Sequence, residues 1–406
     1  MGLLITGIIF ILFIRQIQNE DGDTQRAMLG SFVVLFVFSL VLNWYMEHVI
    51  GWEYGIPGVD LRAFFDAAQA LSKGTKLTEL GSIRFCFEWK LSNIGYMLYV
   101  IFIYLIAFTP TVISIRFSLQ LIYVIQIIVA ILACNYICNF FVKKETLQKK
   151  YLYIVMISNV GIMQQSSILM RDIWIVFFIS LLMKECNKKK SSIKKCVVFI
   201  FIAFILRSYS VIITIPVFIA YGLKKKKFAV ISSISFFAVL LIGTNIISIL
   251  AHYFNIKWKY DFNYNIKQII LFILYPNPIN QAKIIKTGSE LYYHSVFGGN
   301  CAWIYFLLAC WNIAIYPLAL YGVYLKIKKG IEVDFILWLF AIINILMVYN
   351  IFYNSVSEPR HKLMMLYGIL YFLNEAIRGM TSKSKAIYGI CMTLLYSIII
   401  LKFIIL

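Results

Sequence analysis

Long apolar runs separated by short charged clusters dominate this chain. A membrane-spanning helix needs about 20 apolar residues, and runs of roughly this kind recur along the whole sequence. They are Gly2–Ile14, Gly30–Ile50, Leu91–Pro110, Phe117–Val142, Tyr151–Met170, Ile173–Met183, Cys196–Gly222, Phe228–Leu250, Ala302–Leu325, Phe335–Tyr353, Leu363–Ile377 and Ile387–Leu406. The pattern predicts an all-α, polytopic transmembrane bundle of roughly 11–13 spans, built as a single integral membrane domain over residues 1–406.

The composition excludes the soluble classes of protein. Apolar residues make up 62% of the chain and charged residues 14%, with a mean hydropathy of +0.84. A soluble globular domain carries about 25% charged residues. Because so few polar side chains cannot cover a soluble surface, membrane lipids are the predicted surroundings.

The net charge of +20 comes from lysine clusters that lie between the apolar runs. Basic loops of this kind are cytoplasmic by the positive-inside rule, and they face anionic headgroups. Nucleic acid is therefore not a predicted partner. The clusters are Lys143–Lys144, Lys149–Lys150, Lys188–Lys190, Lys194–Lys195, Lys224–Lys227 and Lys326–Lys329.

The same rule orients the second half of the chain. Counting spans between the basic clusters places the turn near Arg171, the long loop Ala251–Cys301 and the loop Asn354–Lys362 on the outer side. The run Cys196–Gly222 lies between two basic clusters, which requires an even number of passes. It therefore predicts a hairpin with Arg207 near its tip, a single span being the alternative.

The loop of residues 51–90 has no charge signal of its own, because five acidic residues balance five basic ones between Glu53 and Lys90. Strict counting of spans places it in the cytoplasm. Within it, apolar residues recur at helical spacing from Leu61 to Leu71, which predicts an amphipathic helix in the membrane interface. Asp60 begins that helix, either as its N-cap or as a carboxylate at the mouth of a membrane cavity.

Charged side chains at membrane depth are costly, so they are candidates for function. Arg171 and Asp172 follow the run Ser166–Met170, and Arg207 is flanked by apolar residues on both sides. An outer-face cluster, Arg360-His361-Lys362, precedes a late span. The structural alternatives are an interfacial ion pair, a buried ion pair and snorkelling interfacial charge, respectively.

The outer loop Ala251–Cys301 is rich in basic and tyrosine residues, including Lys283 and Lys286. Positive charge on an outer loop runs against the usual bias, which favours an anionic ligand such as a sugar phosphate. P-loop, HExxH, GxSxG and dinucleotide motifs are missing from the sequence, and its four histidines have no ligand spacing. Neither a metal site nor a cofactor is predicted.

Taken in order, the outer elements resemble a known family. They are Gly58-Val59-Asp60, Ser166–Asp172, Leu206-Arg207, Tyr275–Pro278 and Arg360–Lys362. This layout resembles the Wzy-type polymerases of O-antigen and capsular polysaccharide, and more distantly the membrane glycosyltransferases that use lipid-phosphate sugar donors. An Arg-x10-Gly pattern of some members matches Arg84 and Gly95, which carries little weight because chance readily gives such a match.

The resemblance implies an enzyme of the bacterial cytoplasmic (inner) membrane. It would join oligosaccharide repeat units carried on undecaprenyl pyrophosphate, on the outer face, with a flippase and a chain-length regulator as partners. Cations must then hold the leaving pyrophosphate, and a base must deprotonate the acceptor hydroxyl. Arg171, Arg207 and Arg360 suit the first task, helped by Lys283 and Lys286, and Asp60, Asp172 or His361 suit the second. The family also places residues 53–90 outside, which requires one apolar run, such as Phe117–Val142, to be irregular.

Three other functions stay open. One is a different lipid-linked glycosyltransferase or ligase, and another is the flippase that moves the lipid-linked unit. The long loop Ala251–Cys301 and the missing internal repeat disfavour the flippase. A non-catalytic assembly partner is the third.

Overall fold

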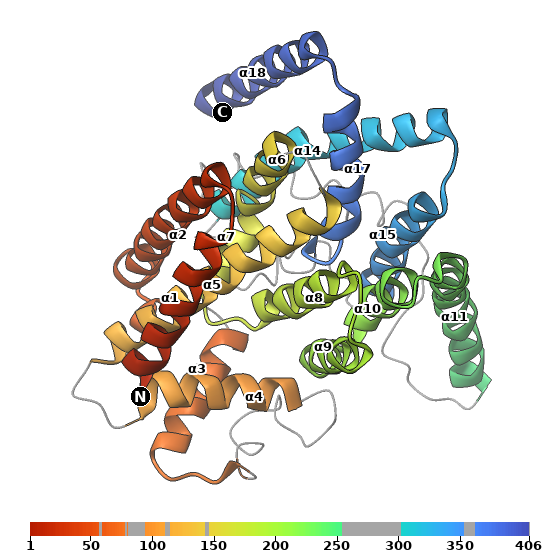
Figure 1. Cartoon of the computed structure of the whole chain (residues 1–406). Helices are drawn as coiled ribbons and strands as arrows, with labels where there is room; N and C mark the ends of the chain where they lie inside the picture. Colours follow the sequence, from red (N-terminus) through yellow and green to blue (C-terminus); the bar gives the residue numbers. More distant parts are fainter. Residues whose placement is uncertain are drawn as a thin grey trace. The chain divides into compact units, whose positions relative to one another are not determined.

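The structure is a computed structural model, and it describes residues 1–56, 59–77, 79, 94–109, 114–142, 146–253, 302–352 and 362–405. Helix accounts for 86% of these residues, and the described part of the chain contains no strand. An all-helical fold follows from the long apolar runs, because a helix satisfies every backbone polar group within its own segment. The predicted all-α class is therefore confirmed for these residues (Figure 1).

The chain forms two compact units. The N-terminal unit comprises Met1–Lys184 and Lys194–Ser210, and the C-terminal unit comprises Glu185–Ile193 and Val211–Leu406. The helices of the first unit are α1 (Gly2–Gln18), α2 (Gly22–His48), η1 (Glu53–Gly55), α3 (Val59–Ser72), α4 (Ile94–Ile103), η5 (Tyr104–Phe108), α5 (Ile115–Phe141), α6 (Thr146–Ile157), α7 (Val160–Ser166), α8 (Asp172–Cys186), α9 (Ile193–Leu206) and η6 (Ser208–Ser210). Those of the second are α10 (Val211–Val217), η7 (Phe218–Gly222), α11 (Lys226–Tyr253), α14 (Ala302–Lys329), α15 (Val333–Phe352), α17 (Leu366–Gly379) and α18 (Ser382–Ile405).

Three helices in the described part of the chain are long and apolar enough to cross a membrane. They are α2, α5 and residues Ile304–Lys329 of α14. Shorter apolar helices span Gly2–Gln18, Ile94–Phe108, Ser208–Gly222 and Val333–Val348. These helices support a membrane protein, and the larger number of spans stays a prediction.

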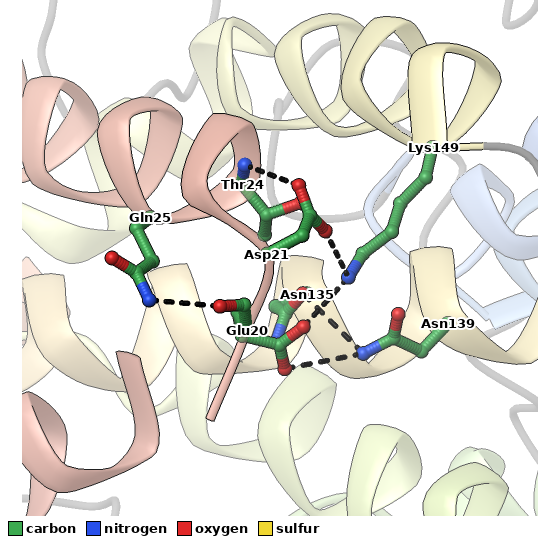
Figure 2. Close-up of polar contacts among 7 residues, drawn as sticks. All are labelled: Glu20, Asp21, Thr24, Gln25, Asn135, Asn139 and Lys149. Atoms are coloured by element: carbon green, nitrogen blue, oxygen red, sulfur yellow. Dashed lines mark hydrogen bonds and ion pairs between the residues drawn. The ribbon is translucent and has the colours of Figure 1, made fainter. Parts of the chain in front are cut away.

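At one end of the N-terminal unit, a polar network connects the turn between α1 and α2 to α5 and α6 (Figure 2). The Glu20 carboxylate, in the turn between α1 and α2, accepts hydrogen bonds of 2.7 Å from Asn135 of α5 and from Lys149 of α6. Its neighbour Asp21 caps α2 by accepting from the backbone N–H of Thr24 at 3.0 Å. We call this the Lys149 end of the unit. This network was not predicted from the sequence, because an acidic pair between two apolar runs does not indicate which residues it will contact.

The opposite end gathers other contacts. Glu47, near the end of α2, pairs with Arg116 at the start of α5 at 2.5 Å. Asn43 of α2 donates to the Ser167 carbonyl at 3.1 Å, which holds the segment before Arg171 at the same end. From there α8 leads back to Lys184, whose ammonium lies 3.8 Å from the centre of the Tyr136 ring, near the Lys149 end. We call the end at which Glu47, Arg116 and the segment before Arg171 lie the Arg171 end.

Within the apolar run Leu91–Pro110, the described residues 94–109 do not connect the two ends. Gly95, in the first turn of its helix α4, lies against the last turn of α9, at the Arg171 end. Its continuation η5 places Ile106 against Gly2, at the start of α1, and Phe108 against Phe65 of α3. Because α1 ends near Glu20, its start lies at the Arg171 end, so α4 and η5 begin and end there. In Figure 1, α4 crosses close to the N-terminus.

This finding corrects two expectations. Leu91–Pro110 is not a pass between the ends of the unit, and the irregular run is this one and not Phe117–Val142, which forms the unbroken 27-residue helix α5. An apolar helix buried in protein has the same composition as one buried in lipid, so hydropathy alone misjudged it. With one pass removed, Glu53 and α3 lie at the Arg171 end, opposite to where strict counting had placed them.

The amphipathic helix predicted after Asp60 is confirmed as α3. Its apolar face packs on protein instead of lipid, because Phe64 lies 5.1 Å from the Tyr96 ring and 5.0 Å from the Tyr99 ring. Its polar face carries Arg62, which pairs with Glu53 at 2.8 Å and so ties α3 to η1. Helix α3 therefore helps to hold α4 in place at the Arg171 end.

Polar contacts also organise the C-terminal unit. Asp334, at the start of α15, accepts from Lys226 at 2.6 Å and from the Tyr221 hydroxyl at 3.1 Å. Lys326, near the end of α14, lies 3.5 Å from Glu375 of α17. These pairs join lysine clusters to acidic helix ends, as expected where helices meet an aqueous surface.

The placement of α3 predicts the accessibility of the loop that follows it. A cysteine at Thr75 should react with a membrane-impermeant maleimide in intact cells, because the Arg171 end faces outward if the lysine-rich Lys149 end is cytoplasmic. A cysteine at Lys150 is the matched control and should react only after permeabilisation. Equal labelling of the two positions, measured above that of the parent chain, would contradict the arrangement.

Candidate functional site

The segment between α7 and α8 places two charged residues inside the N-terminal unit. Helix α7 ends at Ser166, the chain is non-helical from Ser167 to Arg171, and α8 begins at Asp172. Arg171 is 3% exposed and Asp172 is 2% exposed. An acidic residue in the first turn of a helix is stabilised by the helix dipole, which explains why α8 starts at this carboxylate.

Arg207 meets Asp172 from another part of the chain. Helix α9 ends at Leu206, and the Arg207 guanidinium lies 3.4 Å from the Asp172 carboxylate, with side-chain exposures of 12% and 2%. The run Cys196–Gly222 is thus broken at Arg207, and the predicted hairpin stays a prediction. The predicted candidates Arg171, Asp172 and Arg207 lie together although 35 residues separate the last two.

Arg171 rests on an aromatic ring. Its guanidinium carbon lies 3.6 Å from the centre of the Tyr96 ring of α4, within the range of a cation–π interaction. Arg171 is almost fully buried, and a second cation, Arg207, lies nearby. A guanidinium group that is removed from water beside another cation is in an unfavourable environment.

The charges of this cluster do not balance. Two guanidinium groups and one carboxylate carry a net charge of +1, and all three groups are largely buried. Within the described residues, Arg171 Nη1 and Asp172 Oδ2 are buried and have no hydrogen-bond partner. A buried donor and a buried acceptor without partners, on residues that are neighbours in the sequence, suit a ligand that carries negative charge together with a hydroxyl group.

Gly95 fixes the distance between α4 and the broken end of α9. A Cβ atom added to Gly95 would collide with the Ile205 carbonyl oxygen and lie 2.8 Å from the Leu206 Cα. Both are backbone atoms directly before Arg207, so they cannot move aside cheaply. Sequence reasoning found this glycine only through the Arg-x10-Gly match, and it missed Tyr96, because an aromatic residue in an apolar run has no distinguishing signal.

The other predicted site residues are placed only in part. Asp60 is the second residue of α3, and its side chain lies outside the described residues, as do Lys283, Lys286, Arg360 and His361 in full. Among the residues that the structure describes, no three or more His, Cys, Asp or Glu side chains gather as metal ligands would.

No protein-family model, curated protein or solved structure matches this chain. Each of the two guanidinium groups can bind phosphate oxygens bidentately, and the nearby Asp172 carboxylate can accept a proton from a hydroxyl group.

Gly95 offers a test of the close packing at this site. Gly95→Ala should destabilise the protein by about 1–3 kcal/mol, the usual effect of overpacking, because the new methyl group meets backbone. Gly7→Ala in α1 is the matched control, since a Cβ there meets nothing within 4 Å. Thermal unfolding in detergent measures both, and equal melting temperatures for the two variants would refute the close approach.

Proposed function

We propose that this chain is a polysaccharide polymerase of the bacterial cytoplasmic membrane. It joins oligosaccharide repeat units carried on undecaprenyl pyrophosphate into O-antigen or capsular polysaccharide on the outer face. The observation that supports this proposal best is the cluster of Arg171, Asp172 and Arg207, in which buried positive charge exceeds negative charge. Such a cluster suits a pyrophosphate leaving group.

The arrangement of the N-terminal unit supports the outer location. Its Lys149 end carries the lysine-rich loop, which the positive-inside rule assigns to the cytoplasm. The Arg171 end then faces outward. Helix α5 shows how far the cluster lies from the start of that helix. Gln126, eleven residues after the start of α5, donates a hydrogen bond to the carbonyl of Met170, which directly precedes Arg171. Eleven residues correspond to about 16 Å of helix, so the cluster lies about this far along α5 from the start of the helix.

The chemistry assigns each charged group a role. Arg171 and Arg207 bind the pyrophosphate oxygens and stabilise the charge that develops as the bond between the anomeric carbon and the phosphate oxygen breaks. The acceptor sugar hydroxyl forms the new bond to that carbon, and Asp172 takes its proton through Oδ2. Undecaprenyl pyrophosphate leaves with the bonding electron pair.

A gene deletion tests the proposed activity. Cells that lack the protein should carry surface glycolipid with no repeat or a single repeat, in place of a ladder of chain lengths. Loss of a flippase would instead leave the repeat unit trapped on the inner face, and loss of a ligase would leave the polymer attached to its undecaprenyl pyrophosphate carrier. A normal ladder in the deletion strain, on gel electrophoresis of the glycolipid, would exclude the polymerase.

Arg207 tests the site. Arg207→Lys keeps a positive charge opposite Asp172 but loses the planar fork that binds phosphate, so the protein should accumulate normally while the ladder shortens. Arg207→Ala should abolish the ladder, and it also leaves the Asp172 carboxylate buried without this partner, which costs about 3–5 kcal/mol when a buried pair is broken.

Polymer length and membrane abundance must therefore be measured together. Lys226→Ala in the C-terminal unit serves as a surface control, although it also removes the partner of Asp334. A full ladder from Arg207→Lys would show that the guanidinium only maintains the structure. A full ladder from Arg207→Ala would remove Arg207 from the donor site.

A further inference from the structure

Gln126 occupies an unusual position for an amide side chain. It lies in the middle of α5, where it is fully buried among apolar residues. Burying an amide in such surroundings is costly unless it is hydrogen-bonded, and among the described residues its N–H groups have partners whereas its Oε1 has none. Its Nε2 group donates to the Met170 carbonyl at 2.8 Å and to the Tyr99 hydroxyl at 3.0 Å.

The first of these bonds fixes the chain directly before Arg171. The segment turns tightly there, because the Met170 N–H donates to the Ile168 carbonyl at 2.7 Å. On the other side, the Arg171 carbonyl accepts from the Trp174 N–H at 3.0 Å, which starts α8. The peptide between Met170 and Arg171 is thus held from both sides, and Gln126 supplies the contact from outside the segment.

The second bond fixes α4 against the same turn. Tyr99 and Tyr96 are three residues apart on α4, so they lie on one face of the helix. Tyr99 accepts from Gln126, and Tyr96 carries the Arg171 guanidinium 3.6 Å from its ring centre. One amide therefore sets both the turn that presents Arg171 and the aromatic surface on which Arg171 rests.

We propose that Gln126 is a positioning residue, which holds the Arg171–Asp172 turn and the Tyr96 face of α4 in mutual register. It does not touch the reacting groups. The importance of this register for polymerisation rests on the proposed function, whereas the register itself can be measured without any substrate.

Arginine modification measures the register directly. Full-length protein in detergent is treated with phenylglyoxal, which reacts with accessible arginine, and each modified peptide is quantified by mass spectrometry. In the wild type, Arg171 should be protected because it is 3% exposed, whereas Arg116, with a side chain 66% exposed, should react readily.

Gln126→Met removes both N–H donors at nearly constant length and volume. The rate of Arg171 modification should then rise by at least about three- to tenfold, the factor expected from the loss of either one of these two hydrogen bonds. The same change at Gln120, six residues earlier on α5, is the matched control and should leave Arg171 protected. Unchanged protection of Arg171 in Gln126→Met would overturn the proposal, and so would a general rise that includes the reference peptide of Arg116.

If Gln126→Met fails to accumulate, Tyr99→Phe replaces it. That variant removes one hydroxyl and keeps the ring that packs on Phe64 and Phe102. It should raise Arg171 modification in the same direction, and full protection would count against the register.

The polysaccharide ladder separates this inference from the proposed function. A shortened ladder in Gln126→Met at normal abundance supports both. Arg171 exposed with a normal ladder would confirm the positioning role while removing Arg171 from the reaction.

Discussion

A buried guanidinium must have an anion near it, and much of the N-terminal unit is arranged around that requirement. Arg207 interrupts an apolar run, and Asp172 is the described carboxylate that meets it. To bring the two together, α9 must end at Leu206 and α8 must begin at Asp172, which leaves α7 separated from α8 by the non-helical turn. The ends of these helices and the ion pair between Arg207 and Asp172 therefore depend on each other.

The two ends of the unit solve the problem of buried charge differently. At the Lys149 end, Glu20 and Asp21 face one lysine, and Glu20 also accepts a hydrogen bond from the amide of Asn135. Within this network two carboxylates face one ammonium group, but Asp21 is more than one-third exposed and water can screen its charge. In the cluster of Arg171, Asp172 and Arg207 the excess is positive, and all three groups are largely buried. The first network pairs its Glu20 carboxylate with a lysine and two amides, whereas the second keeps an unbalanced positive charge.

The sequence predicted the elements better than their arrangement. Apolar runs gave the helices, and the spacing from Leu61 to Leu71 gave α3, because period and composition act locally. The candidates Arg171, Asp172 and Arg207 were found individually, since charge within an apolar run is conspicuous. Their assembly was not predictable, because it depends on where α8 and α9 end relative to each other.

Two contributions to the site had no signal that could have identified them. Tyr96 looks like any aromatic residue of a membrane helix until a guanidinium is seen on its ring. Gln126 looks like an isolated polar residue in a span, and only the Met170 carbonyl beside it reveals its use. Partners across the fold decide the meaning of both residues, and composition holds no information about partners.

Helix α4 links the error in span counting to the construction of the site. Hydropathy counted Leu91–Pro110 as a pass, but a helix that crossed the unit would carry Tyr96 and Phe108 to opposite ends. Because α4 instead stays at the Arg171 end, it lays Tyr96 beneath Arg171 and Gly95 against the end of α9. It also brings α3, and with it the start at Asp60, to the same end as the ion pair. The segment that broke the expected alternation of spans is thus the one that gathers the distant parts of the candidate site.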